Sequence, residues 1–208
     1  MSAVDFDLYL VTDRNQTGGR DLLRVLERAL DGGVKAIQLR EKDLSGRDLF
    51  LLAERSHKLC QAYHAALFIN DRVDVAMAVD AAGVQLSKSS LPLVTARALL
   101  GPQKIIGIST HSLQEAKEAK QNGADFILFG PVYFTASKAA YGEPQGLAAL
   151  KTIVDNISLP VYAIGGIKAE NIKSTKNCGV RGVALISAIV SAENPTEATQ
   201  TILRQLRG

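Results

Sequence analysis

Eight short runs rich in β-branched and aromatic residues recur along the chain, about 25 residues apart. Between them lie amphipathic stretches, such as 21–30 (DLLRVLERAL) and 195–206 (PTEATQTILRQL), whose apolar residues recur at three and four positions. Regular alternation of strand and helix predicts a parallel sheet covered by helices. The predicted strands are 7–13, 35–41, 65–71, 83–87, 104–110, 125–133, 160–166 and 182–188.

The number of strand-helix units decides between two kinds of parallel sheet. Eight units close into a (β/α)8 TIM barrel, whereas an open doubly wound sheet typically has about five or six strands. The 208 residues, of which 47% are hydrophobic, suffice for one buried core. We therefore predict a protein of the α/β class with a single TIM-barrel domain over 1–208. An open sheet with a nucleotide crevice is the alternative, if the short run 83–87 is a loop.

Composition argues against several classes of function. No stretch approaches the roughly 18 uncharged apolar residues of a membrane span, and 1–13 lack the features of a secretion signal, so we expect a cytoplasmic protein. The 24 basic and 21 acidic residues are scattered without a basic tract, which argues against nucleic-acid binding. Cys60 and Cys178 lack metal or redox spacing and are expected to be packing residues.

Polar residues gather at the ends of the predicted strands, where barrel enzymes have their active sites. The period of two along 35–41 places Gln38, Arg40 and Lys42 on one side, facing the mouth of the barrel. Cations on one inward face repel each other unless an anion lies between them, so a phosphate or diphosphate is the expected ligand. The alternative is a structural network in which Glu41 and Asp71 neutralise the two cations.

Asn70 and Asp71 end the third predicted strand beside these cations. Their oxygen atoms suit a magnesium ion that takes its remaining ligands from substrate phosphate and water. The alternative for Asp71 is to cap a helix that begins near Val73, because Asp is a favoured N-cap residue.

A second phosphate site is predicted after the sixth, seventh and eighth strands. The segment 134–146 (FTASKAAYGEPQG) is long for a barrel loop and is a candidate lid, within which Thr135, Ser137 and Lys138 are placed to close over a phosphate. Gly165 and Gly166 end the seventh strand and Ser187 ends the eighth, where barrels often bind phosphate.

From 9 to the last helix the chain resembles the thiamine-phosphate synthases and their sister group, the thiazole tautomerases. The motifs YLVTD, GVKAIQLREK, INDRVDVA, GISTHSLQEA, GADFILFGPVY, VYAIGGI and ALISAI carry the resemblance, in the family's order and spacing. It implies coupling of hydroxymethylpyrimidine diphosphate to thiazole phosphate, with thiamine phosphate and pyrophosphate as products and magnesium assisting. This is an alkyl-group transfer in thiamine biosynthesis.

The resemblance also implies roles for individual residues. The pyrimidine and its diphosphate would be held by Gln38, Arg40, Lys42, Asn70, Asp71, Ser109 and Lys138, with Asp71 as the metal ligand. The thiazole phosphate or the lid would involve Thr135, Ser137, Gly166, Ile186 and Ser187. Arg40, Lys42, Ser109 and Lys138 are the expected catalytic residues, because stabilisation of the leaving pyrophosphate matters more in this reaction than a strong base.

The sequence departs from the synthases after the fourth strand. They read GVHLGQED, with a second metal-binding Asp, where this chain reads GVQLSKSS, so Ser90 replaces that Asp and Lys88 replaces the preceding Gln. The tautomerases need no metal, but the histidine they place after FG is Pro131 here. Three hypotheses stay open, in this order: a synthase, a tautomerase, and a non-catalytic sensor of a phosphorylated ligand. A homo-oligomer is left open as well.

Overall fold

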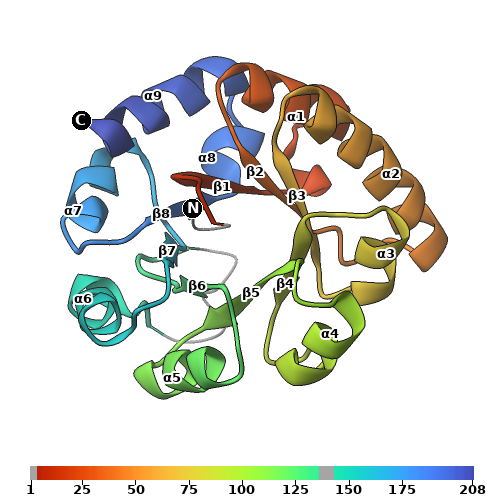
Figure 1. The fold of residues 1–208 in the computed structure, drawn as a ribbon. Coiled ribbons are helices and arrows are strands. Elements are labelled where there is room, and N and C mark those ends of the chain that lie inside the picture. The colour runs from red at the N-terminus through yellow and green to blue at the C-terminus, as the bar shows by residue number, and fades with distance from the viewer. Residues whose placement is uncertain (1–3, 136–142) are drawn as a thin grey trace.

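The chain folds into a closed barrel of eight parallel strands, seen along its axis in Figure 1. This computed structural model describes residues 4–135 and 143–208. Each strand pairs in parallel register with the next, and β8 closes the ring on β1. The strands are β1 (Leu8–Val11), β2 (Ala36–Leu39), β3 (Ala66–Asn70), β4 (Gly83–Leu86), β5 (Ile105–Thr110), β6 (Phe126–Phe129), β7 (Val161–Ile164) and β8 (Gly182–Leu185).

The predicted barrel is therefore confirmed. The short run 83–87 forms β4, which pairs with both β3 and β5, so the alternative of an open sheet is wrong. Strand boundaries are tighter than predicted: β8 ends at Leu185, and Ser187 begins a short helix instead of ending the strand.

Helices surround the barrel in the described part of the chain. They are α1 (Leu22–Asp31), α2 (Gly46–Ala62), α3 (Val73–Ala78), α4 (Leu93–Leu100), α5 (Leu113–Gln121), α6 (Gly146–Asn156), α7 (Ile172–Lys176), α8 (Ser187–Val190) and α9 (Pro195–Arg207), with 3-10 turns η1 (Arg14–Gln16) and η3 (Ala169–Asn171). The last helix, α9, packs against α1 and so closes the outer ring.

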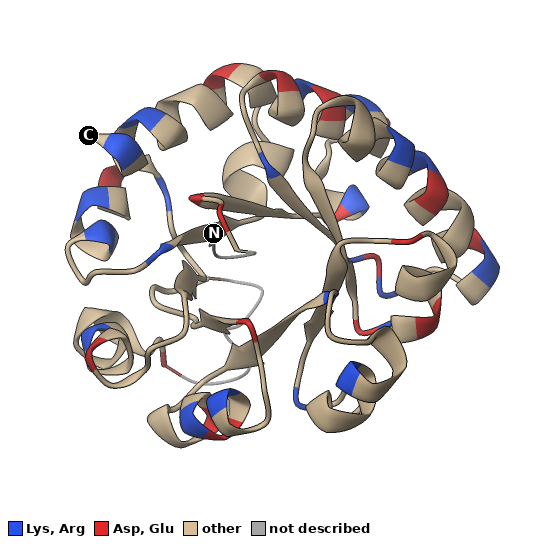
Figure 2. Cartoon of the chain, in the orientation of Figure 1, with Lys and Arg blue, Asp and Glu red and all other residues tan. Residues whose placement is uncertain are grey.

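Side-chain caps explain where several helices begin. Asp21, Ser45 and Ser112 accept hydrogen bonds of 3.1 Å from backbone N–H groups three residues later, in α1, α2 and α5. The charged residues lie mainly on the outer helices, whereas the strands are almost free of them (Figure 2). None of the described helices combines the length and apolar character that crossing a membrane requires.

Five aromatic rings fill the end of the barrel where the strands begin. Phe6, Tyr9, Phe68, Phe126 and Tyr162 are buried, and in nine of their ten pairs the ring centroids lie 4.8–6.4 Å apart. This cluster, the aromatic floor, closes that end of the barrel. The other polar side chains inside the barrel lie at the opposite end, where the strands finish.

Candidate active site

Polar side chains from neighbouring strands meet inside the barrel at the ends of β2 and β3. Gln38 is 2% exposed, and its Nε2 donates a hydrogen bond of 2.9 Å to Asn70 Oδ1. Asn70 Nδ2 donates in turn to Asp71 Oδ2, at 2.7 Å. Because each amide is held by its neighbour, the predicted pyrimidine-binding residues Gln38 and Asn70 form one ordered unit at the base of the mouth.

Arg40 and Lys42 follow β2 at the same end, but not as one continuous strand. The strand ends at Leu39, so its period of two does not extend to Lys42, which lies in a turn and is exposed. The prediction that strand geometry aligns Lys42 with Gln38 is therefore wrong. Arg40 is half-buried, with its backbone N–H fixed by Thr12 Oγ1 at 2.9 Å. Neither cationic side chain has an ion pair or hydrogen bond to a residue that the structure describes.

Glu41 lies between these cations in the sequence, but its carboxylate binds Thr12 and Arg14 instead. Its carboxylate accepts from Thr12 Oγ1 at 2.6 Å, from Arg14 N at 3.1 and 3.2 Å, and from Arg14 Nη1 at 3.3 Å. The Arg14 guanidinium also contacts Asp43, which lowers the pKa of that carboxyl. The alternative in which Glu41 neutralises Arg40 and Lys42 is therefore wrong.

Asp71 is held by hydrogen bonds from three side chains. Its Oδ1 accepts from Ser87 Oγ at 3.1 Å and from Ser90 Oγ, while Asn70 donates to Oδ2. The alternative of a helix cap is wrong: the residue before α3 is Arg72, and no side chain caps that helix. Asp71 also has a positive φ of 59°, a conformation in which Asp is more readily found than most residues.

The donor set does not fit a magnesium site built by the protein. Magnesium takes six oxygen ligands, and three of the lone pairs of Asp71 already accept hydrogen bonds from the chain. Within residues 4–135 and 143–208, no three His, Cys, Asp or Glu side chains gather in a way that could hold a metal ion. Asp71 is left as a single candidate ligand beside serine hydroxyls.

Gln85 is a site residue that the sequence analysis missed. It is 1% exposed, and its Nε2 donates to Ser109 Oγ at 3.2 Å, linking β4 to the predicted catalytic serine on β5. Its Oε1 has no hydrogen-bond partner among the described residues. A buried acceptor without a partner is costly, so Gln85 is suited to receive a donor from a ligand or water. The period of two from Gly83 places Gln85 inside the barrel and was the available signal.

The predicted thiazole-phosphate residues lie at the ends of β6, β7 and β8. Thr135 and Ile186 are half-buried, and Ser187 is exposed at the start of α8. Gly166 has a φ of 66°, and a Cβ there would lie 2.5 Å from Phe134 O, so the glycine makes room for the chain after β6. Ser137 and Lys138, together with most of the predicted lid, lie outside the described residues.

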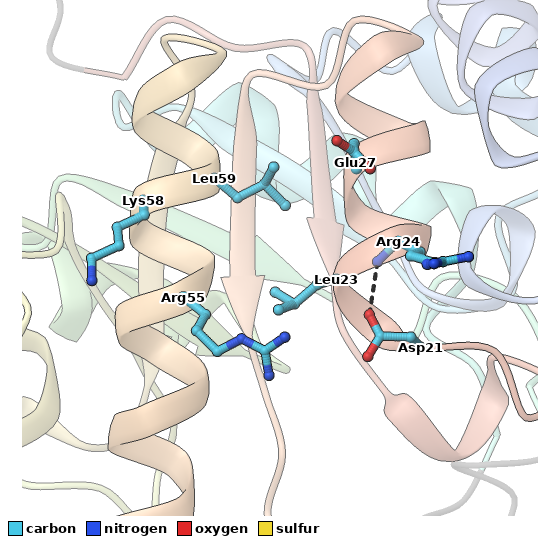
Figure 3. A pocket seen from close by; sticks show the side chains of 7 residues that line it. All are labelled: Asp21, Leu23, Arg24, Glu27, Arg55, Lys58 and Leu59. Carbon is cyan, nitrogen blue, oxygen red and sulfur yellow. Dashed lines mark hydrogen bonds between the residues drawn. The ribbon is translucent and has the colours of Figure 1, made fainter.

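A groove of about 710 Å³ lies elsewhere, on the outside of the barrel between α1 and α2. Leu23 and Leu59 point into it, and Arg55 reaches into the gap (Figure 3). Its remaining lining is charged and of both signs. Its lining includes none of the polar residues at the strand ends, so the groove is not the candidate active site despite its size.

Comparison with known proteins identifies the family. The family described as thiamine monophosphate synthase matches residues 8–189, most of the chain. The chain belongs to this thiamine monophosphate synthase family. The family expected from the sequence motifs is thus confirmed.

Individual relatives agree over nearly their whole length. A thiamine-phosphate synthase of Desulfitobacterium hafniense is 45% identical over 201 residues, which are 97% of each chain. A Geobacter sulfurreducens protein, provisionally named a thiamine-phosphate synthase, is 52% identical over 206 residues, covering 99% of this chain and 97% of its own. The solved thiamine phosphate pyrophosphorylase of Pyrococcus furiosus superposes with a TM-score of 0.89 at 38% identity, covering 97% of this chain and 96% of its own.

Proposed function

We propose that the polar end of the barrel couples hydroxymethylpyrimidine diphosphate to thiazole phosphate, giving thiamine phosphate and pyrophosphate. The chain acts in this proposal as an alkyl transferase in a single barrel domain. Membership in the thiamine monophosphate synthase family supports the reaction. The observation that carries the site is the pair of cations Arg40 and Lys42, which lack an anionic partner in the described structure while Glu41 is engaged by Arg14.

The reaction sets requirements that these side chains meet. The bond between the pyrimidine methylene carbon and the diphosphate oxygen breaks, and pyrophosphate leaves with the electron pair. The thiazole nitrogen then donates its lone pair to the pyrimidine-methyl cation, forming the new carbon–nitrogen bond. The charge that develops on the leaving group is stabilised by positioned cations, here Arg40, Lys42 and, outside the described residues, Lys138.

The amides and hydroxyls at the base of the mouth have a positioning role in this proposal. Gln38, Asn70 and Ser109 are linked to their neighbours by hydrogen bonds of 2.9, 2.7 and 3.2 Å, so they present fixed groups to the pyrimidine. Thr135, Gly166, Ile186 and Ser187, with Ser137, are assigned to the thiazole phosphate at the opposite side of the mouth. Holding both reactants in line supplies much of the rate acceleration in such a reaction.

Of the expected chemistry, magnesium binding has the least support from the side chains at the mouth. Asp71 is the residue assigned to it, and a metal there would depend on substrate oxygens and water for its other ligands. The charge on the leaving pyrophosphate is therefore assigned to the cationic side chains alone. A cytoplasmic location and a homo-oligomeric state stay predictions.

The direct test is formation of thiamine phosphate by the purified protein from both phosphorylated substrates, with Mg²⁺ and with chelator. Product formation is expected, and Arg40→Ala should abolish most of it. Wild-type protein that binds thiazole phosphate but forms no product would overturn the proposal. Interconversion of thiazole carboxylate phosphate isomers in that case would indicate a tautomerase, and its absence a sensor.

A further inference from the structure

The loop after β4 ties itself to the end of β3 through serine hydroxyls. Ser87 and Ser90 both donate to Asp71 Oδ1, and Ser87 N donates to Ser90 Oγ at 2.6 Å. Because that backbone N–H already points at the Ser90 oxygen, the Ser90 hydroxyl proton is available for Asp71. Residues 87–90, here called the serine loop, are thus fixed against the mouth of the barrel.

Hydrogen bonds to this loop and to Asn70 occupy both carboxylate oxygens of Asp71. Its Oδ1 has two lone pairs and two hydroxyl donors, and its Oδ2 accepts from Asn70 at 2.7 Å. It forms no ion pair with any described lysine or arginine. The carboxylate therefore serves as a hydrogen-bond acceptor that positions the loop.

Lys88 is carried by the serine loop, between the two serines that bind Asp71. It is exposed and has neither a hydrogen bond nor an ion pair with a described residue. The tethers on both sides restrict where its backbone can lie, so the side chain of Lys88 starts from a fixed position at the mouth beside β3. With Arg40 and Lys42, the mouth then has three cations without an internal anionic partner in the described chain.

We propose that Lys88 binds the substrate diphosphate directly and carries part of the positive charge that the reaction requires there. Ser87 and Ser90 act as positioning residues that hold the serine loop through Asp71. This inference rests on the proposed function, because that function supplies the diphosphate. As the bond to the methylene carbon breaks, the ammonium stabilises the added charge on the leaving pyrophosphate without transferring a proton.

The test measures binding of inorganic pyrophosphate by calorimetry, in chelator and in Mg²⁺. In chelator, Lys88→Ala should raise the dissociation constant roughly tenfold or more, since a hydrogen bond to a charged group is lost. Lys88→Arg should retain most of the affinity, and Lys58→Ala, on the outer face of α2, should leave it unchanged. An unchanged dissociation constant for Lys88→Ala, or wild-type binding that occurs only with Mg²⁺, would overturn the inference.

A second variant tests the role of Asp71 in the serine loop. Ser90→Asp replaces a hydroxyl donor by a second carboxylate, so it should weaken pyrophosphate binding in chelator and make binding dependent on Mg²⁺. Circular dichroism establishes that the variant is folded. Pyrophosphate affinity that stays independent of Mg²⁺ in folded Ser90→Asp would contradict the arrangement inferred for Asp71.

The inference and the proposed function can fail separately. Loss of pyrophosphate affinity in Lys88→Ala, in a protein that forms no thiamine phosphate, would retain the anion site and reject the synthase. Product formation with unchanged pyrophosphate affinity in Lys88→Ala would retain the synthase and reject the role of Lys88.

Discussion

The two ends of the barrel are built from the same strands, yet they differ in how many of their polar and charged side chains lack a hydrogen-bonding or ionic partner. On β3, Phe68 belongs to the aromatic floor, whereas Asn70, two residues later on the same face, belongs to the mouth. At the floor, rings contact rings, and the Tyr9 hydroxyl is the one polar atom of these rings without a partner among the described residues. At the mouth, Gln85 keeps an unpaired acceptor, and Arg40 and Lys42 have no anionic partner among the described residues.

Along each strand, the residues at the floor should therefore contribute mainly to stability and those at the mouth mainly to function. The floor buries apolar area and needs no ligand, so changes there should alter unfolding before they alter chemistry. At the mouth, the half-buried Arg40 lacks an anion and the buried Gln85 acceptor lacks a donor, so a bound substrate can relieve both costs. Substitutions at the two ends should therefore differ in whether they lower stability or activity.

The largest effect is expected for Phe126→Ala in the aromatic floor. Removing a fully buried ring should lower the free energy of unfolding by about 3–5 kcal/mol, measured by urea denaturation. Phe134→Ala makes the same substitution at a side chain that is 70% exposed, and it should change stability by less than about 0.5 kcal/mol. Equal losses in the two variants would contradict the special role of the floor.

Arg40→Ala should show the reverse pattern at the mouth. The guanidinium has no partner in the described chain, so stability should hardly change, while kcat/KM should fall by about 10²–10³ through loss of charge stabilisation. Arg55→Ala, in the outer groove between α1 and α2, is the matched control and should retain full activity. Activity lost in Arg55→Ala but kept in Arg40→Ala would place the site in the groove.

Gly107→Ala should disturb both ends at once, because Gly107 lies between them. A Cβ there would approach Phe126 Cζ to 2.3 Å and Gln85 Oε1 to 2.4 Å. We expect a loss of about 1–3 kcal/mol in stability together with a raised KM. In Gly46→Ala the new Cβ meets only the flexible end of Arg72, at 3.2 Å, and little change is expected. An unchanged KM in Gly107→Ala would mean that the floor can be disturbed without affecting the mouth, contrary to this expectation.

The smallest effect distinguishes two tyrosines within the floor. Tyr162 OH donates to Phe6 O at 2.7 Å, so Tyr162→Phe should cost about 1 kcal/mol. The buried Tyr9 OH has no partner in the described structure, so Tyr9→Phe should be neutral or slightly stabilising. Burial raises the pKa of both phenols, so both are neutral at pH 7 and the difference should not depend on pH near neutrality. Thermal unfolding measures both, and the opposite ranking would contradict this description.

The repeated strand-helix spacing was enough to predict the barrel because each unit is a local pattern. The same local reasoning misplaced Lys42, because the period of two holds only as far as the strand, which ends at Leu39. It also gave Glu41 the wrong partner, since Thr12 and Arg14 approach it only when β1 and β2 are adjacent.

The serine loop shows most clearly what sequence could not provide. The sequence indicates only that Ser90 replaces a metal-binding Asp, and nothing in the spacing of 71 and 90 reveals that Ser87 and Ser90 both donate to Asp71. Those contacts depend on the pairing of β3 with β4. Residues at strand ends can therefore be predicted as a group, whereas their hydrogen-bond partners follow from the register of neighbouring strands.

The most direct test of the central claim is a crystal structure of the protein with inorganic pyrophosphate. Our account predicts the anion at the ends of the strands, within hydrogen-bonding distance of the Arg40 guanidinium, with no anion between α1 and α2. Pyrophosphate bound instead to Arg24 and Arg55 in the outer groove, with the mouth unchanged, would contradict it.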